Sequence, residues 1–112
     1  MEVKSVSKNT GIAPQKMRLI ADLVRGKKVN DALNVLKFAP TPHARLVAKV
    51  VKAAASDAER LHNVSMDSLR VKEIRADEAT TLRRYRARAR GRAGAVLKRS
   101  SHITVVVGEQ ED

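Results

Sequence analysis

Arginines alternate with other residues in one stretch of this chain, a spacing with chemical meaning. Four of them occupy every second position, at Arg84, Arg86, Arg88 and Arg90. In an extended strand, this spacing places four guanidinium groups on one face. Each guanidinium can bind phosphate oxygens through two parallel hydrogen bonds. Two of the intervening residues are alanines, which keep the opposite face thin enough to pass between RNA segments. The predicted chemistry of this stretch is therefore phosphate binding.

These arginines belong to a longer basic segment, residues 79–99, which we call the arm. Its positions 82–99 contain no acid and eight basic residues: Arg83, Arg84, Arg86, Arg88, Arg90, Arg92, Lys98 and Arg99. Such a density of like charge repels itself unless an anionic partner is close. We therefore expect a polyanion to order the arm.

Three conformations of the arm can be compared. A helix would be basic on every side and interrupted by Gly91 and Gly94, although leucine, arginine and alanine favour helices. A disordered, solvated arm is the second alternative. The two glycines and the β-forming run at residues 103–107 favour the third, a hairpin embedded in RNA. Because an isolated two-stranded ribbon is marginally stable in water, we expect binding and ordering to be one event.

Composition limits the partners of this 112-residue chain. Residues 82–99 contribute +8 to a formal net charge of +11, which points first to nucleic acid and second to an anionic membrane surface. The only aromatic residues are Phe38 and Tyr85, so binding of single strands by base stacking is not expected. Charged residues interrupt every apolar run in residues 1–30, and we expect neither a signal peptide nor a membrane span. Structured RNA or a duplex is the predicted partner.

Catalysis, metal binding and cofactors are not expected. Cysteine is absent, which excludes disulfides and Cys-based zinc sites. His43 and His62 lie near the two ends of one predicted helix, about 28 Å apart, too far to share a metal. Nothing near Ser101 and His102 supplies an oxyanion hole. Hydrogen bonds to RNA backbone, or a strand cap, are the expected roles of these two residues.

Hydrophobic periodicity predicts three helices after a short strand at residues 3–8. The first runs from Pro14 to Arg25 and stops at Gly26. The second follows Asn30 as N-cap and reaches Phe38, and the third has Thr41 as N-cap and Pro42 as first helical residue. Apolar residues at helical spacing predict the buried face of each helix: Met17, Ile20, Ala21 and Val24 in the first; Ala32, Leu33 and Leu36 in the second; and Ala44, Val47, Ala48, Val51, Ala54, Ala55, Ala58 and Leu61 in the third.

Two strands enclose the arm. One begins at Leu69, with a slip of phase at Glu73–Ile74 that indicates a bulge, and the other runs from Leu97 to Val107. With Gly91 and Gly94 in the turn, they predict one very long hairpin whose tip stands about 40 Å from the sheet. The expected fold class is α+β, with three helices packed on a small antiparallel sheet and one long protruding β-hairpin. We expect one domain, with residues 1–78 and 100–108 as the globular body, 79–99 as the arm and 109–112 as an acidic tail.

The body offers further candidate anion-binding residues. Lys4 and Lys8 are predicted on one face of the first strand. The first turns of the first helix present exposed N–H groups and the positive end of the helix dipole, both of which favour a phosphate. With the arm, the complete predicted nucleic-acid-binding set is Lys4, Lys8, Gln15, Lys16, Arg18, Lys27, Lys28, Arg83, Arg84, Arg86, Arg88, Arg90, Arg92, Lys98, Arg99, Ser101 and His102.

Three segments resemble a known family. QKMRLIADLVRGK at 15–27, RARGRA at 88–93 and LKRSSHITVVV at 97–107 are similar to the bacterial large-subunit ribosomal protein numbered twenty-two. The resemblance implies a cytoplasmic protein at the outer surface of the large subunit, without homo-oligomers or membrane contact. It further implies a hairpin threaded through several domains of ribosomal RNA, with neighbouring ribosomal proteins and the nascent polypeptide as other partners. The tip lining the peptide exit tunnel would consist of Arg88, Ala89, Arg90, Gly91, Arg92 and Ala93.

Two other functions remain open at this point. An architectural DNA-binding protein could place the basic ribbon in a groove, but such ribbons usually carry a wedge residue and act as dimers, and neither feature is evident. A nuclease or other hydrolase would need metal- or His-dependent turnover.

Overall fold

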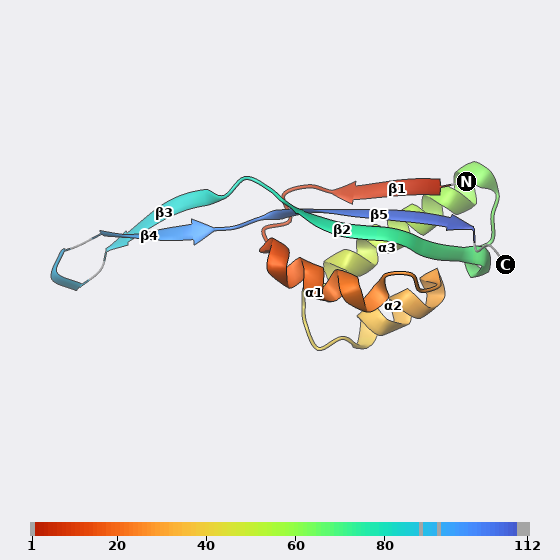
Figure 1. Cartoon of the computed structure of the whole chain (residues 1–112), viewed down its shortest axis with the longest axis horizontal. Coiled ribbons are helices and arrows are strands. Elements are labelled where there is room, and N and C mark those ends of the chain that lie inside the picture. The colour runs from red at the N-terminus through yellow and green to blue at the C-terminus, as the bar shows by residue number, and fades with distance from the viewer. Residues whose placement is uncertain (1, 88, 92, 110–112) are drawn as a thin grey trace.

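A three-stranded antiparallel sheet forms the centre of the body (Figure 1). The computed structural model describes residues 2–87, 89–91 and 93–109 of the chain. The three strands of the sheet are β1 (Glu2–Ser7), β2 (Leu69–Glu78) and β5 (Ser101–Glu109). The strand order is β1–β5–β2, so the last strand in sequence is the central one. Ile103, Val105 and Val107 alternate along β5 and are all fully buried, so one face of this central strand belongs to the core.

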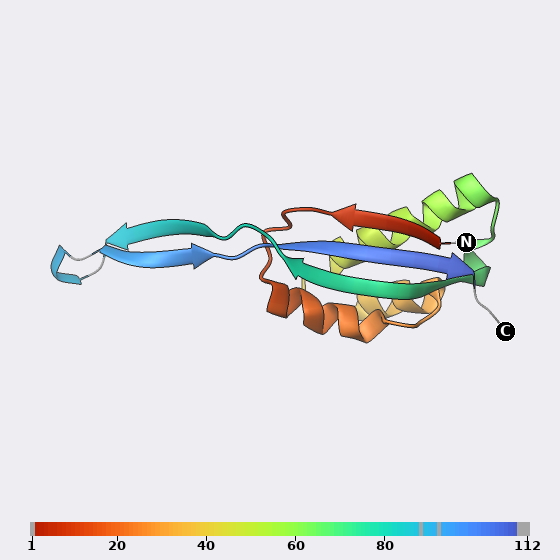
Figure 2. The same ribbon diagram turned by 45° about the horizontal axis from the view of Figure 1, so that its top comes forward.

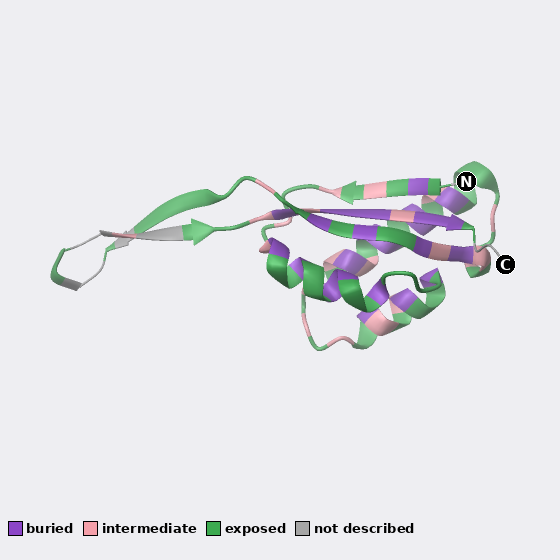
Figure 3. Cartoon of the chain, in the orientation of Figure 1, coloured by how far each residue is buried: buried purple, intermediate pink, exposed green. Residues whose placement is uncertain are grey.

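Helices cover one face of this sheet (Figure 1). They are α1 (Pro14–Val24), α2 (Val29–Phe38) and α3 (Ala44–His62). Helices α1 and α3 contact the strands, and α2 packs mainly against α3. Figure 3 shows the buried residues gathered between the helices and strands β2 and β5. The α+β class with three helices on an antiparallel sheet is confirmed.

The predicted apolar faces of the helices are largely confirmed. All four residues predicted for α1 are buried, and most of those predicted for α2 and α3. Leu33 and Ala48 are only half-buried, and Val50, which was not predicted, is buried. The prediction for Leu61 is wrong, since it is 64% exposed. The last buried residue of α3 is Ala58, so helix packing ends one turn before the helix does.

Two helix starts differ from the predictions. Lys28, not Asn30, is the N-cap of α2, and the Asn30 side-chain amide donates instead to Asp67 Oδ1 at 2.7 Å. Helix α3 begins at Ala44, after a turn at residues 41–43. The Thr41 hydroxyl accepts a bond of 3.4 Å from the His43 N–H, as predicted for a cap, but the turn that it caps precedes α3.

Gly26 ends the first helix as predicted, and its conformation is one that glycine adopts without strain. Its φ angle is +79°, in the left-handed region. Its N–H donates to Val71 O at 3.1 Å, and the Val71 N–H donates to Lys27 O at 2.9 Å. The predicted bulge in β2 is present one residue earlier than expected, because the register shifts between Val71 and Glu73.

The arm is a second, separate ladder of two strands, β3 (Leu82–Ala87) and β4 (Ala93–Lys98). Figures 1 and 2 show it projecting away from the sheet, and the molecule measures 64 × 25 × 19 Å. The predicted continuous strand at 97–107 is broken, since residues 99–100 belong to no strand. At this break, a backbone hydrogen bond from the Ala79 N–H to Ser100 O, 3.0 Å long, connects the two segments that lead from the sheet into the arm.

The turn at the tip uses one of the two predicted glycines. Residues Ala89–Gly91 form a 3₁₀ turn, in which Arg90 and Gly91 both have positive φ angles, 62° and 72°. Gly94 lies instead within β4, opposite Arg86. Its predicted role in the turn is wrong, because strand pairing continues past Gly94 toward the tip, as far as Ala87 and Ala93.

Candidate nucleic-acid interface

Arginines on the arm lie on both faces of its ladder. Opposite residues in an antiparallel pair share a face, so Leu82 and Lys98 lie together, and Arg83 lies with Leu97 on the other face. Arg84 follows on the face of Lys98. The arm therefore presents cations in two directions rather than one.

The predicted row of four arginines at every second position is only partly a strand face. Arg84 and Arg86 belong to β3, which ends at Ala87. Arg90 does not continue the row, because it lies in the tip turn with a left-handed backbone. Arg88 and Arg92 are outside the described residues.

Cations of the arm differ from those of the body in their surroundings. Among the described residues, every ion pair lies in the body: Arg25 with Asp22, Arg60 with Asp57, Lys72 with Glu2, and Arg75 with Glu73 and Asp77. Hydrogen bonding to Glu73 and the charges of Glu73 and Asp77 raise the pKa of Arg75. The described arm cations Arg83, Arg84, Arg90, Lys98 and Arg99 are exposed and form no ion pair with a described acid. Their charge is therefore available to an external polyanion.

The predicted binding residues of the body occupy separate places. Lys4 is exposed in the middle of edge strand β1, and Lys8 follows its end. Lys27 and Lys28 lie beyond the C-terminal end of α1, about 16 Å from its start for an 11-residue helix. The structure thus does not bring all the basic residues of the body into one patch.

The first turn of α1 is the part of this set that lies beside the arm (Figure 1). Its residues Gln15, Lys16 and Arg18 are exposed, and this turn contains no acid and no side-chain cap. Gln15 and Arg18 line one cavity together with Glu78 and Arg99. Arg18 also donates from Nε to Ala76 O at 3.2 Å, which ties α1 to β2 and orients the remaining guanidinium N–H groups.

The side chain of Ser101 was predicted to contact RNA, but it is not available for this contact because it is buried. The residue is fully buried, its Oγ donates to Ile12 O at 2.8 Å, and it shares a further bond of 2.9 Å with Thr10 Oγ1. His102 is half-buried, and its Nδ1 accepts a bond of 3.0 Å from the Asn9 N–H. The side chain of Ser101 therefore has a structural role, which is to hold the loop at residues 10–12 against the start of β5.

Replacing Ser101 is expected to affect stability. Ser101→Ala leaves the Ile12 carbonyl without its buried donor, so the free energy of unfolding should fall by about 1–3 kcal/mol in urea denaturation. Ser7→Ala is the control, because Ser7 is half-buried and makes no side-chain hydrogen bond to a described residue; its effect should stay within about 0.5 kcal/mol. Loss of RNA affinity in folded Ser101→Ala, without loss of stability, would contradict the assignment.

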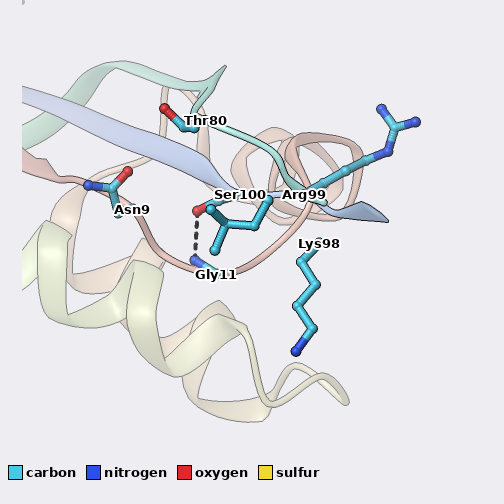
Figure 4. Close-up of a pocket in the computed structure, with 7 residues that line it drawn as sticks. Asn9, Gly11, Thr80, Lys98, Arg99 and Ser100 are labelled. Carbon is cyan, nitrogen blue, oxygen red and sulfur yellow. Dashed lines mark hydrogen bonds between the residues drawn. The ribbon is translucent and has the colours of Figure 1, made fainter. Parts of the chain in front are cut away.

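The root of the arm contains residues that the sequence did not single out as functional. A pocket at this point is lined by Asn9, Gly11, Thr80, Leu82, Lys98, Arg99 and Ser100 (Figure 4). The signal that could have found it is the Asn9-Thr10-Gly11 break, where Asn9 and Gly11 have φ angles of 54° and 77°. This loop bends back onto β5, and the Gly11 N–H donates to Ser100 Oγ at 2.9 Å.

Comparison with known proteins gives the family. Residues 5–108, almost the whole chain, match the family described as ribosomal protein L22p/L17e. The chain belongs to this family. It is 50% identical to large ribosomal subunit protein uL22 of Dehalococcoides mccartyi over 109 residues, covering 97% of this chain and 100% of the relative. The proteins of the same name from Syntrophobacter fumaroxidans and Macrococcus caseolyticus are 47% and 46% identical, covering 98% and 99% of this chain and 100% and 90% of their own.

Membership of the L22p/L17e family confirms the resemblance carried by the three sequence segments. It supports a structural role in the ribosome rather than an enzymatic one. Among the described residues, no cluster of three or more His, Cys, Asp or Glu side chains could hold a metal ion. None of the described helices has the length and apolar character needed to cross a bilayer.

Proposed function

We propose that this chain is a structural component of the large ribosomal subunit that binds large-subunit RNA, supports its assembly and reaches the peptide exit tunnel with the tip of its arm. The body would lie at the outer surface, and neighbouring ribosomal proteins would contact it there. Relatives that are 46–50% identical over nearly the whole chain carry the name of a large-subunit protein. The observation that carries the RNA-binding part is that the described cations of the arm are exposed and form no ion pair with a described acid.

The shape of the molecule supports an arm inserted between RNA segments. Its described part consists of the two strands, the tip turn and the linking residues 79–81 and 99, and none of these belongs to the hydrophobic core. A ribbon of this kind gains little from burial within its own chain, so its residues are available for phosphate contacts on both faces. Among the predicted binding residues, we retain all except the side chain of Ser101.

Association with the particle tests the proposal first. A tagged chain should co-sediment with the large subunit and remain bound through washing at moderate salt. A crosslinker replacing Arg90, which is exposed in the tip turn, should label the nascent peptide on stalled ribosomes. The same crosslinker replacing Arg60 of α3 is the control and should not label it. Absence of the chain from the particle would overturn the proposal, and labelling from both positions would remove the tunnel assignment.

Competition between nucleic acids separates this function from DNA binding. At one fixed salt concentration, large-subunit RNA should displace the chain from duplex DNA of equal length. Preference for the DNA would favour an architectural role on the chromosome.

A further inference from the structure

We propose that the pocket at the root of the arm binds one unstacked nucleotide of ribosomal RNA. The base would enter the pocket, and its phosphates would contact Lys98 and Arg99 at the rim. This inference rests on the proposed function and adds to it a specific binding site. It assigns to the root a recognition of bases, whereas the remainder of the arm contacts backbone phosphates.

The pocket has the size and the mixture of groups that a nucleotide requires. Its volume is about 360 Å³, within the range of ligand pockets. Leu82 supplies an apolar wall, with 47% of its surface exposed. Leu82 and Lys98 form the first pair of the arm ladder, so the apolar wall and a cation lie on the same face. An apolar surface beside a cation suits the flat face of a base and the phosphate attached to it.

Polar groups without partners remain in the pocket. The side-chain amide of Asn9 is exposed and makes no hydrogen bond to a described residue. Such an amide can donate and accept at once, which is how asparagine recognises the edge of a base. The hydroxyl of Thr80, also exposed, makes no hydrogen bond to a described residue and can serve a second base atom or a phosphate. Figure 4 shows these two residues across the pocket from Lys98 and Arg99.

The pocket is held rigid from the side of the body. The Thr10 N–H donates to Ser101 O at 2.9 Å, and the Gly11 N–H donates to Ser100 Oγ at 2.9 Å. With the bond from the Asn9 N–H to His102 Nδ1, three consecutive residues are tied to residues 100–102. A site that is already ordered loses little entropy when the ligand binds. The arm itself has no comparable support, so the root is the place where base recognition can be specific.

The position of the pocket gives the bound nucleotide a second effect. Residues 79–81 and 99–100 are the only described link between the arm ladder and the sheet, and they belong to neither. Thr80 and Arg99 come from these two linking segments, whereas Asn9 comes from the body. A nucleotide that contacts all three would fix the direction of the arm relative to the body.

Asn9→Ala tests the site, and the chain offers a matched control. Asn9 and Asn63 are both exposed asparagines with left-handed backbones, φ 54° and 55°, so alanine introduces the same strain at each. Only Asn9 lines the pocket. The full-length variants are bound to large-subunit RNA, and the reactivity of every base is measured with reagents that modify Watson–Crick edges.

The expected result has two parts. One base protected by the natural chain and by Asn63→Ala should become reactive with Asn9→Ala, and the affinity of Asn9→Ala should be about tenfold lower. The dependence of affinity on salt should be unchanged, because no phosphate contact is removed. A protection pattern identical for all three proteins would overturn the nucleotide site and leave the proposed function intact. Failure of the natural chain to bind the RNA would overturn the proposed function itself.

Discussion

Affinity for large-subunit RNA is expected to fall about two-thousand- to twenty-thousandfold between about 50 and 200 mM salt, if the eight basic residues of the arm each neutralise one phosphate. The reason is that each neutralised phosphate releases condensed counterions. The logarithm of affinity then changes by about −0.7 to −0.9 per phosphate for each unit of log salt. Filter binding or fluorescence anisotropy over a series of salt concentrations measures this slope. A shallow slope would contradict phosphate binding by the arm.

Deletion of the arm should abolish most of the dependence of RNA affinity on salt. Ala79 and Ser100 are joined by a backbone hydrogen bond, so residues 80–99 can be replaced by Asn-Gly, a pair suited to a two-residue hairpin turn. The variant retains every residue of the hydrophobic core. Equal affinity and equal slope before and after the deletion would refute RNA binding through the arm.

Changing arginine to lysine separates charge from geometry. A variant with lysine at Arg83, Arg84 and Arg90 keeps the net charge, so its salt slope should match that of the natural chain. Its affinity should be lower, because an ammonium group cannot make the paired hydrogen bonds of a guanidinium. An unchanged affinity would show that the arm acts only through its charge.

Ile103→Ala is expected to lower the free energy of unfolding of the body by about 2–5 kcal/mol. Ile103 is fully buried in the central strand β5, between Ser7 of β1 and Ala76 of β2. The substitution creates a cavity in the core that the neighbouring strands and helices can only partly fill. Urea denaturation followed by circular dichroism measures the change. Val106→Ala is the control, since Val106 is half-buried on the same strand, and a smaller loss is expected there.

The same substitution in the arm-deleted chain tests the division into body and arm. If residues 1–78 and 100–108 fold without the arm, the loss caused by Ile103→Ala should agree within about 0.5 kcal/mol in the two backgrounds. A clearly different loss, or an arm-deleted chain that does not fold, would show that the arm contributes to the body.

Residue types and their spacing along the chain were sufficient for the fold class. The apolar face of α1 was predicted except for Pro14, because Met17, Ile20, Ala21 and Val24 follow the helical period without interruption. The end of that helix at Gly26 was also predicted, since its left-handed backbone favours glycine. The starts of α2 and α3 were not. Asn30 and Thr41 are good caps by type, but Asn30 bonds to Asp67 from another part of the chain, and Thr41 caps the turn that precedes α3 instead of the helix itself.

The sequence alone determined that the basic arm is charged and lies outside the core, because charge and turn residues act locally. Tertiary structure decided three things about it. The ladder is interrupted at residues 99–100, Gly94 lies in a strand, and the loop at Asn9–Gly11 closes on the root. It also decided that Ser101 is buried while Asn9 remains open to a ligand. These outcomes depend on strand register and on contacts between residues about 90 positions apart, which no local pattern of residues encodes.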